Sequence, residues 1–248
     1  MRAGDNLDIE KIVARVTEEV YARLGDRAPQ ESASALAGTI EHSLLNPDAS
    51  ADTIRKGCEE AAKYGFANVC VSPYYVSMAA GLLRGSGVAV CTVAGFPHGA
   101  ASTKAKCAEI REAIMNGATE IDVSMMFVAI KSGDFEGARK DLREMIEVAG
   151  GRAKIKAIYE QGILTDEEKV KALKIAVECG ADFIKISNAL TGKKACVEDV
   201  KFVRSVIGEK TLIKIDGGIK DAKTVRELIA AGAQRFGCSA SVKIVTGE

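Results

Sequence analysis

Residues 182–187 read Asp-Phe-Ile-Lys-Ile-Ser, and residues 211–216 read Thr-Leu-Ile-Lys-Ile-Asp. In both stretches isoleucines alternate with charged or hydroxyl side chains, which is the two-residue period of a β-strand. Each strand therefore has one apolar face, and the opposite face carries Lys185 and Lys214 at matching positions. This combination indicates a closed barrel, because the outer strand face of a barrel packs on helices while its interior can carry chemistry.

Eight β-rich runs alternate with helical patterns along most of the chain. We expect strands at residues 39–45, 67–72, 88–94, 120–124, 155–160, 182–187, 211–216 and 234–237. Amphipathic helical spacing lies between them, for example at residues 51–64, 103–116, 166–179 and 222–231. Because this alternation is typical of parallel βαβ units, the sequence predicts an α/β fold, a TIM (β/α)8 barrel catalytic domain over residues 37–248.

A separate amphipathic helix is expected near the N-terminus, at residues 7–24. Its apolar residues recur at steps of three and four: Ile9, Ile12, Val13, Val16, Val20 and Leu24. We therefore predict an extra helix within residues 1–25 and a linker at residues 26–36. The simplest interpretation of the helix is a cover for the barrel floor or an oligomer contact. It also resembles the targeting helices of enzymes packed into bacterial microcompartments, which makes contact with a shell or cargo protein the alternative.

The composition excludes several function classes. The 34 basic and 34 acidic residues balance and aromatic residues make up 5% of the chain, so the usual supports for nucleic-acid binding are missing. No apolar run approaches the roughly 20 residues of a membrane helix. The seven cysteines never occur in Cys-x-x-Cys spacing, which favours reduced thiols in a cytoplasmic protein. His42 and His98 lie far apart without further ligands at metal-binding spacing, so we expect no metal and no other cofactor.

The polar face of the predicted strands is the candidate site. Its side chains are Glu41, Ser43, Asn68, Cys70, Ser72, Asp122, Ser124, Lys156, Glu160, Lys185, Ser187, Lys214 and Asp216. Charged groups cost free energy in a barrel interior unless they are paired. A set of lysines and carboxylates on this face therefore indicates an active site rather than a purely structural interior.

Lys185 and Lys214 are the candidate catalytic pair. Two neighbouring ammonium groups repel each other and burial also favours the neutral amine, so we expect a lowered pKa for at least one of them. A neutral lysine attacks carbonyl groups to form a Schiff base, and Asp122 could move protons during carbinolamine formation and C–C cleavage. Spacing alone leaves one alternative, a structural Lys–Asp–Lys ion network without turnover.

Ordered motifs after the linker carry a resemblance to a known family. They are Ile-Glu-His-Ser-Leu-Leu-Asn-Pro at 40–47, Val-Cys-Val-Ser-Pro at 69–73, Thr-Val-Ala-Gly-Phe-Pro-His-Gly-Ala at 92–100, Glu-Ile-Asp at 120–122, Leu-Thr-Asp-Glu-Glu-Lys at 164–169, Gly-Ala-Asp-Phe-Ile-Lys at 180–185 and Ile-Lys-Ile-Asp-Gly-Gly-Ile at 213–219. In these residues the chain resembles the deoxyribose-phosphate aldolases. The resemblance implies a metal-free class I aldolase on a TIM barrel. Within it Lys185 would form the Schiff base, Lys214 would lower the pKa of that lysine, and Asp122 would transfer protons.

The resemblance also implies a substrate and a set of binding residues. Family members cleave 2-deoxyribose 5-phosphate reversibly to acetaldehyde and glyceraldehyde 3-phosphate, and a homo-oligomer is expected by the same resemblance. The substrate-binding candidates are Cys70, Ser187, Asn188, Asp216, Gly217, Gly218, Gly237 and Ser239. The glycines and Ser239 follow the seventh strand or lie in and after the eighth, where barrels commonly bind phosphate.

The chain departs from the family pattern around the substrate. After the Schiff-base lysine, Ile-Ser-Asn-Ala at residues 186–189 replaces the usual Thr-Ser-Thr-Gly, and Asp216 replaces a small residue or serine before the Gly-Gly pair. Lys220 stands where arginine is frequent, and Ala240 replaces a serine. Two alternatives follow: a Schiff-base aldolase for a different substrate, including a non-phosphorylated one, and a non-catalytic barrel that serves as a scaffold or assembly protein.

Overall fold

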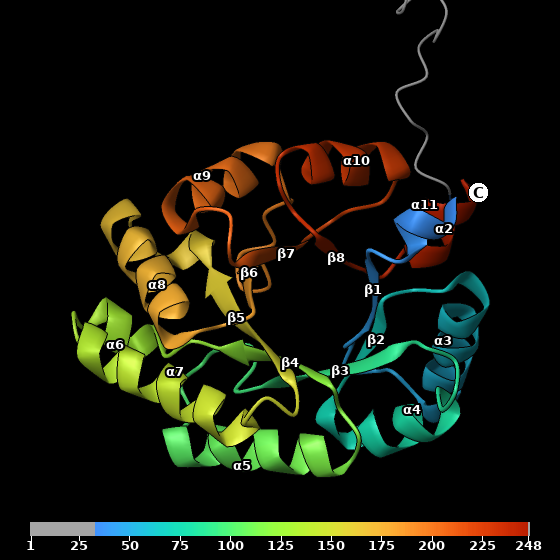
Figure 1. Ribbon diagram of the computed structural model, residues 1–248, viewed down its shortest axis with the longest axis horizontal. Helices are drawn as coiled ribbons and strands as arrows, with labels where there is room; N and C mark the ends of the chain where they lie inside the picture. The colour runs from blue at the N-terminus through green and yellow to red at the C-terminus, as the bar shows by residue number, and fades with distance from the viewer. Residues whose placement is uncertain (1–32, 248) are drawn as a thin grey trace, which may run out of the picture. The chain divides into compact units, whose positions relative to one another are not determined.

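Eight parallel strands form a closed barrel in chain order, and β1 pairs with β8 to complete it (Figure 1). The strands are Ile40–Leu44 (β1), Asn68–Val71 (β2), Ala89–Ala94 (β3), Glu120–Ser124 (β4), Lys154–Glu160 (β5), Phe183–Ser187 (β6), Leu212–Asp216 (β7) and Arg235–Cys238 (β8). This computed structural model describes residues 33–247. Each strand overlaps the run predicted for it, and the predicted TIM barrel is confirmed.

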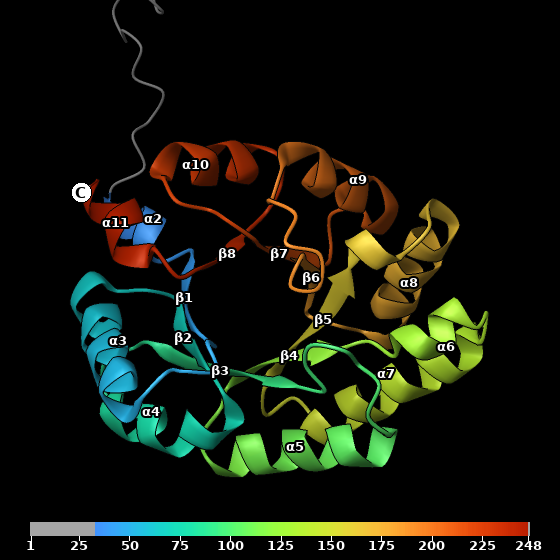
Figure 2. The same cartoon turned by 180° about the vertical axis from the view of Figure 1, so that it is seen from behind.

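Helices surround the barrel on all sides (Figures 1 and 2). The α-helices are Ala33–Ala37 (α2), Ala51–Tyr64 (α3), Val76–Leu82 (α4), Thr103–Met115 (α5), Phe127–Lys131 (α6), Phe135–Ala149 (α7), Asp166–Cys179 (α8), Val197–Ile207 (α9), Ala222–Ala230 (α10) and Ser241–Thr246 (α11). Short 3-10 helices, Pro73–Tyr75 (η1) and Gln161–Ile163 (η2), follow β2 and β5. Within residues 33–247, no helix has both the length and the apolar character needed to cross a bilayer.

The described part of the chain begins with α2. The amphipathic helix predicted over residues 7–24 lies outside the described residues, as does most of the linker predicted over residues 26–36. Leu36 and Ala37, at the end of α2, are each 2% exposed and belong to the main hydrophobic core.

The helix after β5 illustrates how the sequence sets the element boundaries. The Thr165 hydroxyl accepts a hydrogen bond from the backbone N–H of Glu168, and the Glu168 carboxylate accepts one from the N–H of Thr165. This reciprocal capping box satisfies two of the N–H groups that a helix start leaves unpaired. Gly180 caps the C-terminus of α8, and its φ of 84° lies in the left-handed region that glycine adopts without steric cost. The chain then enters β6, the strand that carries Lys185.

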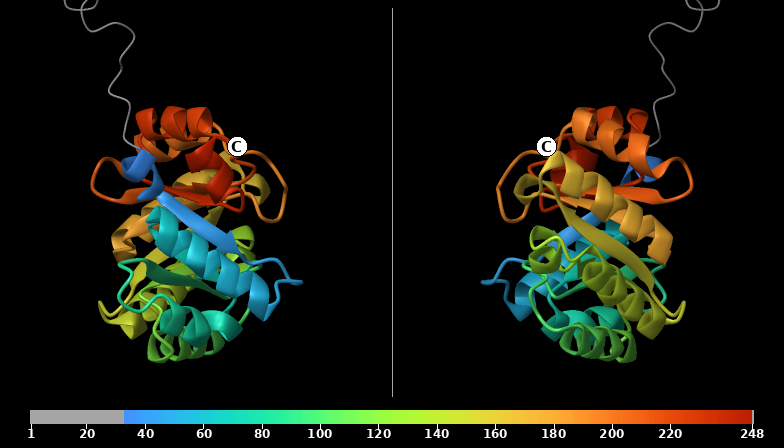
Figure 3. Two further views of the ribbon diagram at one scale, coloured as in Figure 1. Left: turned by 90° about the vertical axis from the view of Figure 1, so that its right-hand side faces the viewer. Right: turned by 90° about the vertical axis from the view of Figure 1, so that its left-hand side faces the viewer.

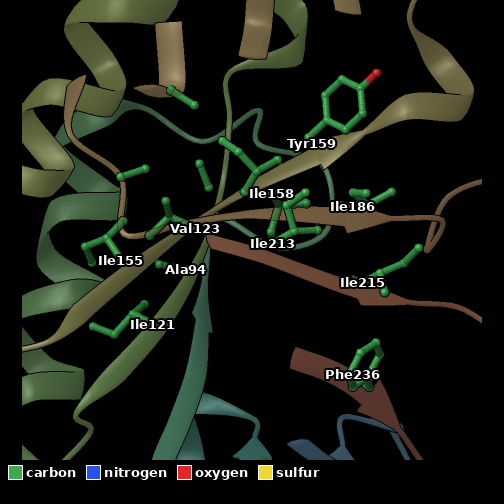
Figure 4. Close-up of a cluster of buried hydrophobic side chains, with 14 of the residues drawn as sticks. Ala94, Ile121, Val123, Ile155, Ile158, Tyr159, Ile186, Ile213, Ile215 and Phe236 are labelled. Atoms are coloured by element: carbon green, nitrogen blue, oxygen red, sulfur yellow. The ribbon is translucent and has the colours of Figure 1, made fainter. Parts of the chain in front are cut away.

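The outer face of the sheet packs on the helices and forms the main hydrophobic core (Figure 4). Its side chains include Ile121, Val123, Ile155, Ile184, Ile186, Ile213 and Ile215, all exposed by 1% or less. Burial of each such side chain stabilises the fold by about 1.5–3 kcal/mol. These are the positions that the two-residue alternation assigns to the helix-facing side, so the opposite positions face the barrel interior.

The strand register sets which interior side chains meet. Lys185 and Lys214 are direct partners on β6 and β7, and Asp122 and Lys156 are direct partners on β4 and β5. The strands run obliquely around the barrel, as β1 and β5 show in the side views (Figure 3). Side chains from strands that are not neighbours therefore meet across the interior, and Asp122 contacts Lys214 in this way.

Candidate active site

The carboxylate of Asp122 lies at the centre of a buried cluster of charges. Its Oδ2 atom lies 2.9 Å from Nζ of Lys185 and 2.6 Å from Nζ of Lys214. The side chains of all three residues are exposed by 2% or less. The structure therefore brings together the three residues that the sequence predicts as catalytic.

Lys156 extends this cluster to two further carboxylates. Its Nζ atom lies 3.2 Å from Oδ1 of Asp122, 3.1 Å from Oε2 of Glu41 and 2.6 Å from Oε2 of Glu120. Glu41 also forms an ion pair with Lys214. Because every one of these buried charges has an opposite charge beside it, the cost of removing it from water is offset.

A cavity of about 430 Å³ gives a small molecule access to Lys185. The cavity is lined by Ser43, Leu45, Asn46, Phe96, Lys185, Ala189, Asp216, Gly217, Gly218, Ile219, Lys220, Gly237, Cys238, Ser239 and Ala240. Most of these residues lie at the carboxyl ends of strands or in the loops that follow, where barrel enzymes bind their substrates. The volume is within the usual range for small-molecule sites.

Asp216 brings a second carboxylate to Lys185 from the side of the cavity. Its Oδ2 atom lies 3.0 Å from Nζ of Lys185, and its side chain is 24% exposed. Gly237 is its partner on β8, where a Cβ atom would lie 2.9 Å from the Cβ of Asp216. The absence of a side chain at Gly237 therefore leaves room for this carboxylate. The centroid of the Phe96 ring lies 5.5 Å from Nζ of Lys185.

The carboxylates determine the charge of the two lysines. Burial lowers the pKa of Lys185, but attraction to Asp122 and Asp216 outweighs burial, so this pKa lies above the ordinary lysine value. Burial also lowers the pKa of Lys214, and Asp122 and Glu41 hold it well above the ordinary value. The lowered lysine pKa expected from the sequence is therefore wrong for the site without substrate. That expectation considered the repulsion between the two lysines and their burial, but not the attraction of Asp122 and Asp216.

Lys214 still acts on Lys185 in the expected direction. Its repulsion lowers the pKa of Lys185, although by less than the two carboxylates raise it. Burial raises the pKa of Asp122, but Lys156 and Lys185 hold it well below the usual aspartate range. Burial likewise opposes ionisation of Glu41, and Lys156 and Lys214 lower its pKa to about 2. Asp122 and Glu41 are consequently ionised at neutral pH.

Two groups of side chains in the interior have metal-ligand chemistry. One consists of Cys70, Cys91 and Asp122 and the other of Glu41, Cys91 and Glu120, and within each group the ligand atoms lie within 4.8 Å of one another. The Nζ atom of Lys156 lies 3.1 Å from Glu41, 2.6 Å from Glu120, 3.2 Å from Asp122 and 3.3 Å from the sulfur of Cys91. An ammonium group thus contacts all three ligands of the second group and two of the three in the first, Cys91 and Asp122. Because it occupies the place of a cation there, these residues do not fit a bound metal.

The predicted substrate-binding residues divide into two groups. Asp216, Gly217, Gly218, Gly237 and Ser239 line the cavity. Cys70, Ser187 and Asn188 are exposed by 3% or less and are not among its lining residues.

Asn188 has a structural role in the loop after β6. Its Oδ1 atom accepts a hydrogen bond from Gln161 at 3.2 Å, and its Nδ2 atom donates to the backbone oxygen of Asp216 at 3.5 Å. These bonds tie the β6 loop to the end of β7. Direct contact between Asn188 and substrate, which the family resemblance implies, stays a prediction.

Three contributors to the site escaped the sequence analysis: Cys91, Phe96 and Glu120. Glu120 lies two residues before Asp122, so the period of the strand could have placed it on the inner face. The sulfur of Cys91 lies 3.3 Å from Asp122, but its neighbours on the inner face give no polar signal. Phe96 lies in a loop, where strand periodicity gives no direction.

A buried ion pair supports the loop that carries Phe96. Lys106 on α5 is fully buried, and its Nζ atom lies 2.6 Å from Asp141 on α7. The same ammonium donates to the carbonyl oxygens of Gly99 and Ser124 at 3.4 Å. It therefore connects α7, the loop after β3 and the end of β4.

Comparison with known proteins adds a family and close relatives. The model of the DeoC/LacD family aldolases matches residues 36–245. The deoxyribose-phosphate aldolase of Brevibacillus brevis is 47% identical over 208 residues, which cover 84% of this chain and 94% of that protein. The deoxyribose-phosphate aldolase of Clostridium tetani is 44% identical over 206 residues, which cover 83% and 95%.

Solved structures give the same similarity in three dimensions. A putative deoxyribose-phosphate aldolase from Coccidioides immitis has a TM-score of 0.82 at 32% identity and covers 100% of this chain and 99% of its own. The aldolase QR15 has a TM-score of 0.81 at 33% identity, with coverage of 86% and 95%. The deoxyribose phosphate aldolase of Aeropyrum pernix, described as tetrameric, has a TM-score of 0.81 at 28% identity, with coverage of 87% and 92%.

Replacement of Lys156 by methionine tests whether the buried charges depend on one another. Lys156→Met leaves Glu41, Glu120 and Asp122 without their shared cation, so we expect the free energy of unfolding to fall by about 3–5 kcal/mol. Lys169→Met is the control, because it removes an ion pair whose Asp166 partner is 90% exposed and should cost less than about 1 kcal/mol. Denaturant unfolding measures the free energy of unfolding of both variants. A loss in Lys156→Met as small as that in Lys169→Met would contradict the mutual dependence of the buried charges.

Proposed function

The chain belongs to the DeoC/LacD aldolase family, and on this premise we propose that it cleaves 2-deoxyribose 5-phosphate reversibly to acetaldehyde and glyceraldehyde 3-phosphate. The covalent intermediate is a Schiff base on Lys185. One observation carries the proposal: Lys185 lines the cavity, and its Nζ atom contacts Asp122 and Asp216. Lysines used in this chemistry need access to a carbonyl compound and neighbouring groups that move protons.

Formation of the Schiff base begins with loss of a proton from Lys185. Asp122 lies at hydrogen-bond distance from the ammonium and supports transfer of that proton. The resulting amine attacks C1 of the open-chain sugar, the N–C1 bond forms, and the carbonyl oxygen takes up a proton. Loss of water from this carbinolamine gives an iminium ion on Nζ.

The charge of the cluster favours the iminium ion. The carboxylates that stabilise the ammonium form of Lys185 also stabilise the iminium, because both carry a positive charge on Nζ. The neutral amine and the carbinolamine carry no positive charge on Nζ, so the carboxylates stabilise them less. The raised pKa of Lys185 therefore slows the first proton loss but stabilises the state from which the carbon–carbon bond breaks.

Cleavage then takes place between C2 and C3. The C3 hydroxyl gives its proton to solvent water, and the O–H electrons form the carbonyl group of the leaving aldehyde. The C2–C3 bond breaks, its electrons form the C1=C2 bond, and the C1=N electrons return to nitrogen as a lone pair. Glyceraldehyde 3-phosphate departs and the enamine of acetaldehyde stays on Lys185. Protonation at C2 and hydrolysis release acetaldehyde and regenerate the amine.

The phosphate end of the substrate binds, in this proposal, near Gly217 and Gly218. Lys220 and Ser239 line the cavity there, and the Cγ atom of Lys194 lies 3.3 Å from the position that a Cβ on Gly218 would take. Lys194 and Lys220 are exposed, and within residues 33–247 neither forms an ion pair. Backbone N–H groups and two unpaired ammonium groups are suited to a phosphate dianion.

Assembly and location are part of the proposal. We propose a homo-oligomer because the Aeropyrum pernix relative is described as tetrameric. A cytoplasmic location, and contact of residues 7–24 with a microcompartment shell or cargo protein, rest on the sequence pattern alone. Small-molecule substrates are the partners that the family membership supports directly.

Borohydride reduction in the presence of acetaldehyde tests the covalent step. We expect one ethyl group on Lys185, located by peptide mass analysis, and no adduct in Lys185→Met. The reason is that reduction fixes the iminium as a stable secondary amine. A wild-type protein without an adduct on Lys185 would favour the non-catalytic scaffold over the aldolase.

Comparison of two sugars tests the substrate. We expect kcat/KM for 2-deoxyribose 5-phosphate to exceed that for 2-deoxyribose on the order of 100-fold, because charged hydrogen bonds to phosphate contribute about 1.5–3 kcal/mol each. Lys220→Met should reduce this preference about tenfold, whereas Lys223→Met, at a side chain 85% exposed on α10, should leave it unchanged. Equal kcat/KM for the two sugars would favour the Schiff-base aldolase for a different substrate.

A further inference from the structure

We propose that Asp216 is a catalytic residue: it takes the proton from C2 of the acetaldehyde iminium and returns it to the enamine. This inference rests on the proposed Schiff base at Lys185 and assigns one of its proton-transfer steps. The two carboxylates that flank the reacting nitrogen thereby have separate tasks, Asp122 at the nitrogen and Asp216 at the neighbouring carbon.

The two carboxylates differ in their surroundings. Asp122 is fully buried, and besides Lys185 it contacts Lys214, Lys156 and Cys91. The side chain of Asp216 is 24% exposed at the cavity wall, and in the part of the chain that the structure describes its single ion-pair partner is Lys185. Of these two carboxylates, Asp216 is therefore the one that borders the space that a bound substrate fills.

Formation of the iminium releases Asp216 from its partner. The ammonium of Lys185 has three N–H groups and serves both carboxylates, which lie 2.9 and 3.0 Å from Nζ. An iminium nitrogen keeps a single N–H, so it can donate to one of them. Asp122 retains its other cationic partners in either case, whereas Asp216 then has a free carboxylate oxygen beside the new bond.

The distances place C2 within reach of that oxygen. C2 is two covalent bonds from Nζ, or about 2.5 Å, and the Asp216 oxygen lies 3.0 Å from Nζ. A general base needs to approach the proton it removes to within hydrogen-bond distance, directly or through one water. A substrate that enters from the cavity extends from the nitrogen into the space that Asp216 lines, whereas Asp122 is not among the residues that line it.

The proton transfer balances without any further reactant. The C2–H bond breaks, its electrons form the C1=C2 bond, the C1=N electrons return to nitrogen as a lone pair, and Asp216 becomes a neutral carboxylic acid. In the direction of sugar cleavage the steps reverse, and the acid delivers its proton to C2 of the enamine.

No other cavity residue offers this chemistry. Among the described residues that line the cavity, Asp216 is the one carboxylate. Burial, with a smaller contribution from Asp216, raises the pKa of the Cys238 thiol to about 12, so Cys238 stays protonated. Lys220 is a cation and Ser239 is a weak base in the absence of a partner.

Two measurements on Asp216→Asn test the assignment. The first is borohydride trapping of acetaldehyde on Lys185, and the second is exchange of the acetaldehyde methyl protons for deuterium in D2O, followed by NMR. Removal of the Asp216 charge eases proton loss from Lys185, so we expect trapping as fast as in the wild type or faster. Loss of the base should slow methyl exchange at least about 100-fold. Asp52→Asn, at an aspartate 97% exposed on α3, is the matched control for both measurements.

Chemical rescue provides a second variant that does not depend on the behaviour of Asp216→Asn. In Asp216→Ser the side chain is shortened and the cavity stays open, so added formate should restore methyl exchange without a change in trapping. Formate should not accelerate exchange in Asp52→Asn.

The outcomes separate this inference from the proposed function. Normal methyl exchange in both Asp216 variants would overturn the assignment and leave the aldolase proposal intact. A parallel loss of trapping and exchange, with no effect of formate, would also overturn it, because Asp216 would then only position Lys185. A wild-type protein that forms no adduct on Lys185 would overturn the proposed function itself.

Discussion

The carboxylate of Asp122 binds Lys185 and Lys214 through one oxygen and Lys156 through the other, and the rest of the site depends on these contacts. An isolated charge in the interior of a protein costs several kcal/mol, so three buried ammonium groups require carboxylates at contact distance. A closed barrel meets this requirement because its interior side chains converge from all strands. The Ile and Val layer on the outer strand faces belongs to the main hydrophobic core and stabilises the barrel through apolar burial.

The same contacts explain why the site is suited to a Schiff base. An environment that holds Lys185 as a cation is also one that stabilises an iminium on the same nitrogen. The carboxylates stabilise the neutral amine and the carbinolamine less than they stabilise the cations. The least stabilised states of the reaction therefore come before the iminium forms. Asp216, which faces the cavity, is the charged contact of Lys185 that a substrate can reach.

The two-residue alternation was sufficient to predict the strands, the inner and outer faces and the pairing of Lys185 with Lys214, because these depend on local periodicity and on neighbouring strands. The alternation did not predict the charge of Lys185. That charge depends on Asp122, which lies two strands away in the barrel, and on the position of the Asp216 side chain. The contact of Phe96 with Lys185 also escaped prediction, since loop residues have no period that orients them.

The central claim is that carboxylates hold Lys185 as an ammonium group, and the pH dependence of Schiff-base formation tests it most directly. The measurement is the single-turnover rate of iminium formation between the wild-type protein and acetaldehyde, with circular dichroism to verify the fold at each pH. The account predicts a rate that rises about tenfold per pH unit from about pH 7 to beyond pH 9, because the fraction of neutral amine rises by that factor below the pKa. A rate that becomes constant near about pH 7 would contradict it, because the pKa of Lys185 would then lie below the ordinary lysine value.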